Sequence, residues 1–234
     1  MFPIGDENER GAGLPLVTIA LIIANVLVFL YQSTLGNEAL QDFVTTYGVI
    51  PQEIENGQDL YTLFTSMFVH GGLAHIGGNM LFLWIFGDNI ERRFGAFLYI
   101  IFYLFTGLAA SAAHIAFNLG STIPSVGASG AISRVLGAYI LMYPTNRIRV
   151  LIGYWGIMAL PAWIFLGIWI VTQTINGVAS PGLETAQTAG VAFWAHIGGF
   201  VAGAVASLVL RMIVGQPQDQ GHTFVRGDRR SGWG

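Results

Sequence analysis

Six apolar stretches dominate this sequence, and each is long enough, or nearly long enough, to cross a lipid bilayer as a helix. A helix needs about 20 apolar residues to span the hydrocarbon core, which is about 30 Å thick. Only 10% of the 234 residues are charged, whereas a soluble domain carries about 25%. The sequence therefore predicts an all-α membrane protein, a bundle of six transmembrane helices over residues 14–31, 75–90, 95–117, 129–144, 149–172 and 192–214.

The placement of the basic residues predicts how these spans are oriented. All ten basic residues are arginines, and nine of them fall in segments that share one side of the membrane if all six spans cross: Arg10, Arg92, Arg93, Arg147, Arg149, Arg211, Arg226, Arg229 and Arg230. The other connections, residues 32–74, 118–128 and 173–191, contain no Arg or Lys. Cytoplasmic loops carry an excess of these residues, so both termini are expected in the cytoplasm.

The predicted organisation has three parts. Residues 1–13 form a cytoplasmic leader, residues 14–214 the six-helix membrane domain, and residues 215–234 a polar, disordered cytoplasmic tail. The leader is acidic and no small-residue cleavage site follows it, so the first span is expected to be retained. The long connection between the first two spans contains an apolar segment, residues 60–68, which is too short to cross and is expected to lie in the outer interface.

Composition and motifs exclude several kinds of site. The chain has no cysteine, so disulfides, thiolate nucleophiles and cysteine metal sites are ruled out. It has no basic run with interleaved aromatic residues, which leaves nucleic-acid binding without support. There is no His-Glu-x-x-His pattern, so a metalloprotease is disfavoured, and no metal or cofactor is expected. A channel or transporter calls for acidic groups within the membrane, and the centres of the predicted spans contain none.

Four polar side chains share one depth in this arrangement. The second, fourth and sixth spans all run from outside to inside. His75 and Asn79 open the second span, Ser129 opens the fourth, and His196 lies about four residues into the sixth. With a rise of about 1.5 Å per residue, all four lie within roughly 10 Å of the outer boundary. Groups far apart in the chain are therefore expected to meet in one layer.

The fourth span is short, since residues 129–143 cover only about 22 Å as a helix. Its start must lie below the outer surface, so the preceding loop, residues 118–128, is expected to dip inward and line a water-filled cavity.

Small residues allow helices to approach closely, and they form facing stripes at Ser129, Ser133 and Gly137 and at His196, Gly199, Gly203 and Ala206. Helix packing alone could also explain these stripes.

Ser129 and His196 together suit nucleophilic catalysis. A serine hydroxyl becomes a good nucleophile when a base such as imidazole accepts its proton. The attack creates an oxyanion, for which His75, Asn79 and the backbone N–H of Ser129 are candidate donors. No carboxylate lies at this depth, so the expected unit is a serine–histidine dyad.

Each polar residue also has a purely structural interpretation. A serine in an apolar helix commonly bonds its own backbone, and a lone histidine is commonly a core residue; His70 and His114 are assigned to the core first. The His-x-x-x-Asn pair, His75 and Asn79, could simply join two helices. The depth that these groups share favours the catalytic interpretation.

The chain resembles the rhomboid family of intramembrane serine proteases over nearly its whole length. The resemblance is carried by HGGLAHIGGN at residues 70–79, ERRFG at 91–95, GASG at 127–130 and AHIGG at 195–199. It implies that Ser129 is the nucleophile and His196 the general base. It also implies an oxyanion hole formed by His75, Asn79 and the Ser129 amide, and supporting motif positions at Gly127, Gly130, His70 and Gly199.

The resemblance implies cleavage of peptide bonds in or near transmembrane segments of membrane-protein substrates, without metal or cofactor. The expected location is a bacterial cytoplasmic membrane, with the active site towards the outer face. Substrates of the family are thought to enter beside a mobile fifth helix, and residues that would let it bend are Gly153, Gly156, Pro161 and Gly167. The alternative is a catalytically silent rhomboid-like protein that binds transmembrane helices, but its usual mark is a missing serine or histidine.

Two positions depart from the family pattern. Many members carry an aromatic residue one turn after the serine that stacks on the histidine, and here that position is Ser133. Candidate substitutes are Phe193, Trp194 and Phe200. The second departure is Arg134, where small residues are more usual. An arginine at the middle of a transmembrane helix costs at least about 2.5–3.5 kcal/mol, and the spans hold no acidic residue near it.

Overall fold

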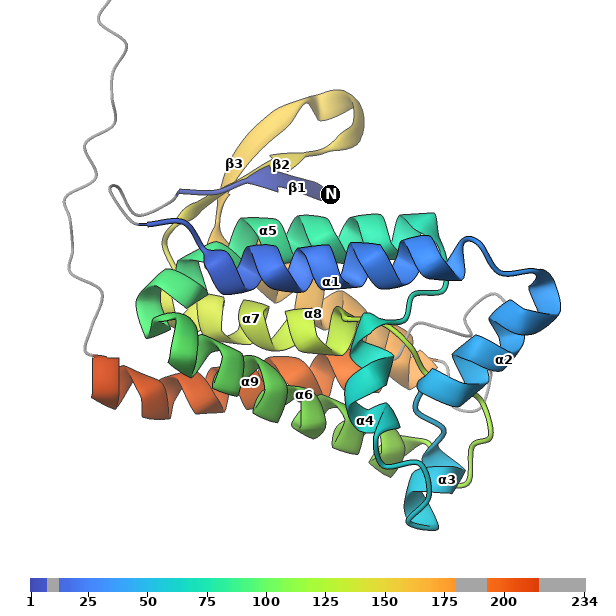
Figure 1. The fold of residues 1–234 in the computed structure, drawn as a ribbon. Coiled ribbons are helices and arrows are strands. Elements are labelled where there is room, and N and C mark those ends of the chain that lie inside the picture. Colours follow the sequence, from blue (N-terminus) through green and yellow to red (C-terminus); the bar gives the residue numbers. More distant parts are fainter. Residues whose placement is uncertain (8–12, 180–192, 215–234) are drawn as a thin grey trace, which may run out of the picture.

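The computed structural model describes residues 1–7, 13–179 and 193–214. In this part of the chain, six helices of 14 or more residues lie side by side and alternate in direction (Figure 1). They are α1 (Leu16–Gln32), α5 (Leu73–Phe94), α6 (Ala96–Phe117), α7 (Ser129–Met142), α8 (Ala162–Ala179) and α9 (Phe193–Val214). Because the directions alternate, α5, α7 and α9 all begin at the same end of the bundle.

Five of the six predicted spans coincide with one of these helices, with ends that differ by a few residues. The fifth, expected over 149–172, is wrong in its first part, because α8 begins only at Ala162 and a β-hairpin precedes it. The first strand of that hairpin alternates exposed and buried side chains, which is the period of a strand and not of a helix. Gly153 and Gly156 lie in its turn at φ of 45° and 77°, so they do not bend the fifth helix. The all-α class is corrected to a mostly helical fold with a small sheet.

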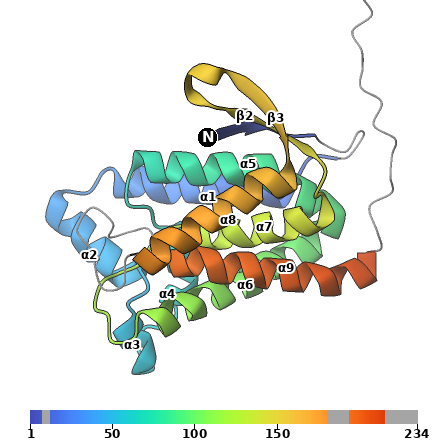
Figure 2. The ribbon, with the colours of Figure 1, turned by 180° about the vertical axis from the view of Figure 1, so that it is seen from behind.

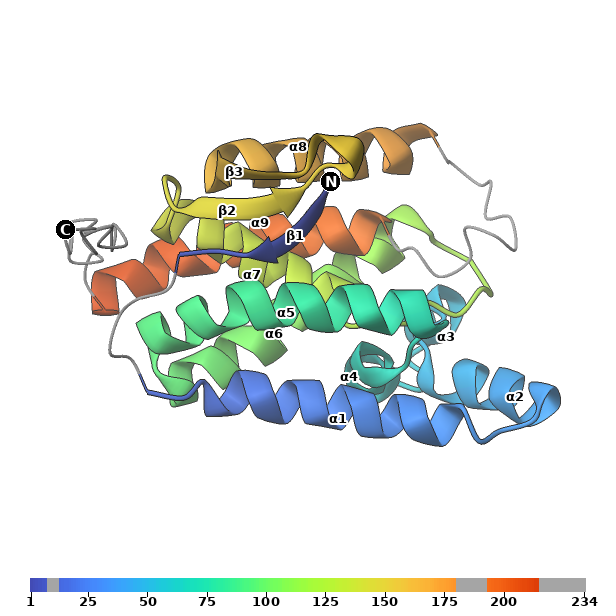
Figure 3. The same cartoon turned by 90° about the horizontal axis from the view of Figure 1, so that it is seen from above.

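The sheet joins the N-terminal residues to this hairpin. It is antiparallel, in the order β1 (Phe2–Gly5), β2 (Arg147–Leu151) and β3 (Ile157–Pro161). In its register Phe2 pairs with Leu151, and Leu151 with Ile157. Seen from above, the sheet lies between α5 and α8 and covers part of α7 (Figure 3). Part of the predicted leader is therefore a strand.

The sheet fixes the first turn of α8. Ile148 and Val150 of β2 are fully buried, in the same apolar core as Leu166 of α8. The backbone N–H of Ala162 donates to the carbonyl of Asn146 over 2.8 Å, just before β2. The beginning of α8 is thus held both by packing and by the backbone.

The connection between α1 and α5 is folded and lies at the end of the bundle where α5, α7 and α9 begin (Figure 1). Its elements are α2 (Asn37–Tyr47), α3 (Pro51–Glu55), α4 (Thr62–Thr65) and a 3₁₀ helix, η1 (Ser66–Phe68). The apolar segment of residues 60–68 is half buried, as expected: Met67 is buried, whereas Leu60 and Phe64 are exposed.

Helix α7 is the centre of the bundle, and eleven of its 14 residues are buried. It contacts α5, α6, α8 and α9. The contact with α9 is made backbone to backbone, because a Cβ atom at Gly137 would collide with the carbonyl of Phe200, and one at Gly203 with the backbone of Arg134. Of the predicted stripes, Gly137, Gly199 and Gly203 lie at this contact, where Gly130 and Arg134, outside the predicted stripe, form the rest of the α7 face.

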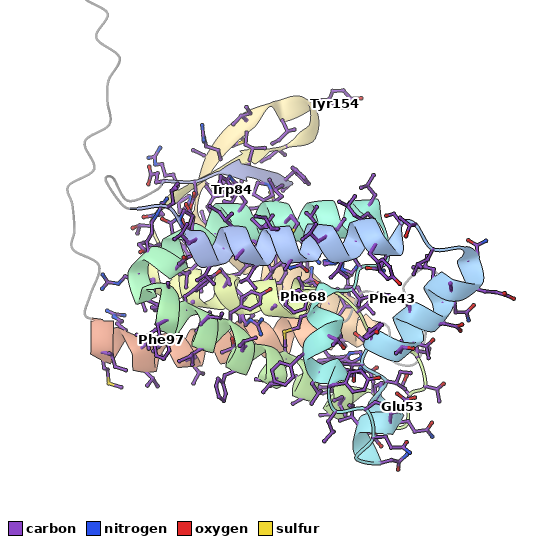
Figure 4. The ribbon with its side chains drawn as sticks, viewed as in Figure 1. Phe43, Glu53, Phe68, Trp84, Phe97 and Tyr154 are labelled. Carbon is purple, nitrogen blue, oxygen red and sulfur yellow. The ribbon has the colours of Figure 1, made fainter. Side chains whose placement is uncertain are left out.

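The outward surfaces of the helices are apolar. Large exposed side chains include Leu27, Leu30, Trp84, Phe97, Phe105, Val201, Val205 and Met212, of which Trp84 and Phe97 are labelled in Figure 4. By length and composition, α6 and α9 could cross a membrane. Helices α1 and α7 and residues 162–176 of α8 are apolar but shorter.

A buried carboxyl group ties the N-terminal strand to the helices. Asp6 follows β1, and its Oδ2 accepts hydrogen bonds from the Tyr139 hydroxyl at 2.5 Å and the Asn89 amide at 2.8 Å. Burial raises the pKa of Asp6 from 3.8 to about 8, and Asp88 adds to this shift, while the bond from Tyr139 and the charge of Arg92 oppose it. The carboxyl group is therefore protonated in the folded protein at neutral pH.

We expect Asp6→Asn to remove part of the pH dependence of stability. Between pH 3.8 and about 8 the folded protein keeps a proton on Asp6 that the unfolded chain has lost. The contribution of Asp6 to the free energy of unfolding therefore falls as pH rises through this range and is level above it. Asparagine mimics the protonated carboxyl group. The unfolding temperature of the variant in detergent should therefore fall less than that of wild type between pH 3.8 and about 8. An equal fall in the unfolding temperatures of the two proteins would contradict the protonation of Asp6 in the folded state.

Candidate active site

The polar residues singled out in the sequence gather at one end of the bundle. His75 lies in the first turn of α5, Ser129 is the first residue of α7, and His196 lies in the first turn of α9. Figure 2 shows the same end from behind, where α8 crosses α7 and reaches α9. The three helix starts thus lie at the same end of the bundle, as the predicted span directions require.

The end of the loop that leads to Ser129 is held against the α1–α5 connection by backbone hydrogen bonds. Ser125 and Val49 exchange two bonds, of 2.8 and 2.9 Å, and the N–H of Gly127 donates to the carbonyl of Ser66 over 2.9 Å. Irregular backbone can lie at membrane depth only where protein or water satisfies it. The folded α1–α5 connection supplies these partners through Val49 and Ser66.

Gly127 brings the Ser129 hydroxyl and the His75 ring to the same place. Its φ is +125°, a conformation that favours glycine. A Cβ atom at this position would lie 2.7 Å from Nε2 of His75 and 3.5 Å from Oγ of Ser129. A larger residue here would therefore displace the imidazole.

Ser129 and His196 are brought close by the contact of α7 with α9. A Cβ atom at Gly199 would collide with the carbonyl of Gly130, and one at Gly130 would lie 3.4 Å from the Cβ of Ala195. His196 is 7% exposed. Its Nε2 is buried and has no hydrogen-bond partner in the described part of the chain, so the Ser129 hydroxyl does not bond to it here. Catalytic hydrogen bonds are often long before substrate binds, and the pairing of the two stays a prediction.

Candidate oxyanion donors lie on the facing helix, α5. Asn79 is 8% exposed, and its amide Nδ2 is buried with no acceptor among the described residues. His75 lies one turn earlier, and its Nδ1 accepts a long bond of 3.4 Å from the N–H of Gly71. The amide of Ser129 belongs to the first turn of a helix, where N–H groups have no acceptor within the helix.

A cavity of about 30 Å³ adjoins Ser129. Its polar lining includes Ser66, Ser111, His114 and Ser125. This volume is enough for at least one water molecule. His114, which the sequence assigned to the core, therefore has its place in the cavity wall beside the candidate nucleophile. Among the described residues, no group of three His, Asp or Glu side chains could hold a metal ion.

His70 has a structural role, as its first interpretation held. The side-chain amide of Gln32, at the end of α1, accepts from the N–H of His70 and donates to its carbonyl, each over 3.1 Å. The His70 ring stands edge-on to that of His75, with centroids 5.2 Å apart. Burial lowers the pKa of His70 to about 4, and His75 adds to the shift. A neutral His70 thus supports the His75 ring.

Sequence comparisons identify the family. A sequence model of the rhomboid domain matches residues 57–213. The chain belongs to the rhomboid family. It is 31% identical to rhomboid protease GluP of Bacillus subtilis over 135 residues, which cover 58% of this chain and 26% of that protein. It is 24% identical to rhomboid protease AarA of Providencia stuartii over 238 residues, 91% of this chain and 78% of AarA. RHOMBOID-like protein 4 of Arabidopsis thaliana is 31% identical over 239 residues, 87% of this chain and 56% of that protein.

The chain spans 26% of the length of GluP and 56% of that of RHOMBOID-like protein 4. Its distant homologues include rhomboid serine proteases, and the family is one of membrane proteases. The chain is thus a rhomboid family membrane protein, a family whose substrates are in general membrane proteins.

The His196 ring of this rhomboid domain is held by aromatic residues from two helices. Phe193 meets it edge-on at 6.3 Å between centroids, whereas Trp194 instead stacks on Phe117. Trp169 of α8 lies 5.8 Å from the His196 ring and also stacks on Phe200. Of the three expected substitutes for the missing aromatic residue on α7, only Phe193 therefore contacts the imidazole directly.

Sequence reasoning missed two residues that touch His196, Trp169 and Gln173. The Oε1 atom of Gln173 lies 2.7 Å from Nδ1 of His196. The available signal was their spacing of four residues on an apolar helix, which places both on one face.

The unusual Arg134 of this rhomboid domain is accommodated by Gly107. Its side chain is fully buried, and the guanidinium carbon lies 4.1 Å from the centre of the Tyr103 ring, a cation–π contact. An Nη2 hydrogen points at the sulfur of Met67 over 3.8 Å. A Cβ atom at Gly107 would collide with Nη1 of Arg134 and with Cε of Met67. The arginine thus occupies the space that this glycine leaves free on α6.

Gly107→Ala is expected to destabilise the protein by about 1–3 kcal/mol, the usual cost of overpacking a filled site. The same change in an Arg134→Ala background should cost much less, because the colliding guanidinium is gone. Unfolding free energies of the four proteins in mixed micelles form a double-mutant cycle that checks this coupling. Equal costs in both backgrounds would show that Gly107 does not accommodate Arg134.

Proposed function

We propose that this rhomboid domain is an intramembrane serine endopeptidase that cuts peptide bonds in or near transmembrane segments, with Ser129 as nucleophile and His196 as base. The observation that carries the proposal is the gathering of Ser129, His75, Asn79 and His196 at the starts of three helices. Two of their polar atoms, Nε2 of His196 and Nδ2 of Asn79, are buried without partners among the described residues. Such atoms are rare in folded proteins, and the reaction would give both a partner: the substrate oxyanion for Nδ2 of Asn79 and the Ser129 hydroxyl for Nε2 of His196.

In the proposed reaction the Ser129 Oγ attacks the scissile carbonyl carbon while Nε2 of His196 takes the hydroxyl proton. The carbonyl oxygen becomes an oxyanion, stabilised by the Asn79 amide, by His75 and by the backbone N–H of Ser129. His196 then passes its proton to the leaving amine as the C–N bond breaks. A water molecule, for which the adjoining cavity has room, hydrolyses the acyl-enzyme and restores Ser129.

We also propose that all six long helices span the membrane, with both termini in the cytoplasm and the site near the outer face. The alternating helix directions, the apolar outward surfaces and the segregation of arginines support this arrangement. A bacterial cytoplasmic membrane is the proposed location. The substrates would be membrane proteins whose transmembrane segments reach the site from the lipid.

Ser129→Ala and His196→Ala are each expected to lower the rate of cleavage at least about 10³-fold, because neither partner acts without the other. Cleavage is measured on a single-span substrate co-reconstituted with the full chain in liposomes. Ser207→Ala is the matched control, since that buried hydroxyl bonds the Ala204 carbonyl in its own helix.

Full cleavage by Ser129→Ala would overturn the assignment of Ser129 as nucleophile. Labelling of wild-type protein by a fluorophosphonate at another residue would do so too. Absence of all cleavage and labelling would favour the silent helix-binding alternative.

Asn79→Ala is expected to lower kcat by about 10²–10³-fold with little change in KM, as for other oxyanion donors. Its effect on stability should be absent or favourable, because the variant removes a buried amide group that lacks an acceptor. Thermal unfolding and cleavage measured on the same preparation separate the two effects, with Asn37→Ala on the exposed face of α2 as control. A fall in stability that accounts for the lost activity would remove Asn79 from the oxyanion hole.

A further inference from the structure

Gln173 is a polar residue of α8 that the proposed reaction does not use. Its Oε1 lies 2.7 Å from Nδ1 of His196, so the contact joins α8 to α9. Trp169 lies one turn earlier on the same face, with its ring 5.8 Å from the His196 ring. Helix α8 thus presents an aromatic surface and an amide to one imidazole.

The hydrogen bond selects one form of the imidazole. An amide oxygen can only accept, so Nδ1 of His196 carries the proton in this contact and Nε2 is left with a lone pair. Nε2 is buried and unpartnered within the described residues. A base that takes a proton from a serine requires this tautomer and a fixed ring orientation.

We propose that Gln173 is a positioning residue that holds His196 in the Nδ1-protonated form and aims Nε2 at Ser129. The proposal rests on the proposed function. Gln173 occupies the place that a buried carboxylate has in a serine–histidine–aspartate triad.

This role connects helix packing with catalysis. Ser129 and His196 lie on α7 and α9, whose glycine contact fixes them relative to each other. Gln173 comes from α8, so the base is correctly held only while α8 is packed against α9.

The test compares three variants of the full chain in liposomes. Gln173→Met keeps the length of the side chain but removes the acceptor, and Gln173→Glu keeps an acceptor. Thr174→Val is the matched control, because that exposed hydroxyl bonds only the Ile170 carbonyl of its own helix. For each protein, kcat and KM for a single-span substrate, the rate of fluorophosphonate labelling without substrate, and thermal unfolding are measured.

Gln173→Met is expected to lower kcat and the labelling rate by about 10- to 100-fold, the range for leaving one imidazole N–H without its acceptor, with KM and unfolding temperature unchanged. Gln173→Glu should restore both rates to within about threefold of wild type, because it restores the acceptor. Wild-type rates in Gln173→Met would overturn the proposal. Equal losses in the Met and Glu variants, with a lower unfolding temperature, would also overturn it, because they would show a packing role.

A readout without substrate separates this proposal from the proposed function. In protein with ¹⁵N-labelled histidine, the His196 signals are assigned by their absence in His196→Ala. The nitrogen shifts of wild type should report a proton on Nδ1, and those of Gln173→Met a mixture of the two tautomers. The same tautomer distribution in both proteins would overturn the positioning role. If neither cleavage nor labelling of Ser129 is found, only the proteolytic function fails.

Discussion

Helices α7 and α9 touch backbone to backbone, and this contact fixes where Ser129 and His196 lie. Gly199 rests against the carbonyl of Gly130, and Gly203 against the backbone of Arg134, so closely that side chains would collide. Small residues permit such an approach between helices. His196 lies one turn before Gly199, and Ser129 directly precedes Gly130. The relative position of Ser129 and His196 therefore depends on the glycines that let α7 and α9 come into backbone contact.

The helices and their common depth could be predicted because hydropathy and arginine placement are strong, additive signals. The start of α8 could not, because the hairpin strands are mostly apolar and continue into the helix without a polar break. The two arginines of β2 alternate with buried Ile148 and Val150, a period of two that is too short to outweigh the long apolar run. The pairing of β2 with residues 2–5 is a contact of long range that no local pattern encodes.

The residues of the site divide in the same way. That Ser129, His196, His75 and Asn79 lie at one end of the bundle was predictable from the motifs and the span directions, whereas their roles stay predictions. The position of Gln173 against His196 was not, because it depends on how α8 is rotated about its axis.

The buried polar groups of this molecule differ in whether the surrounding residues offset the cost of burying them. The charge of Arg134 lies over the Tyr103 ring and against the Met67 sulfur, so part of its desolvation cost is offset. Nδ2 of Asn79 and Nε2 of His196 have no such partners among the described residues, which costs about 1–3 kcal/mol for each group.

The sheet has a mechanical consequence for α8. Its first turn is clamped by the hairpin and, through the hairpin, by strand β1 from the other end of the chain. Gln173 lies three turns further along, where α8 meets α9. Because the hairpin holds the first turn of α8 at Ala162, we expect any displacement of this helix to be largest at its other end. That end carries Gln173 beside the His196 imidazole. We therefore expect the pairing of strand β1 with the hairpin to influence how firmly His196 is held.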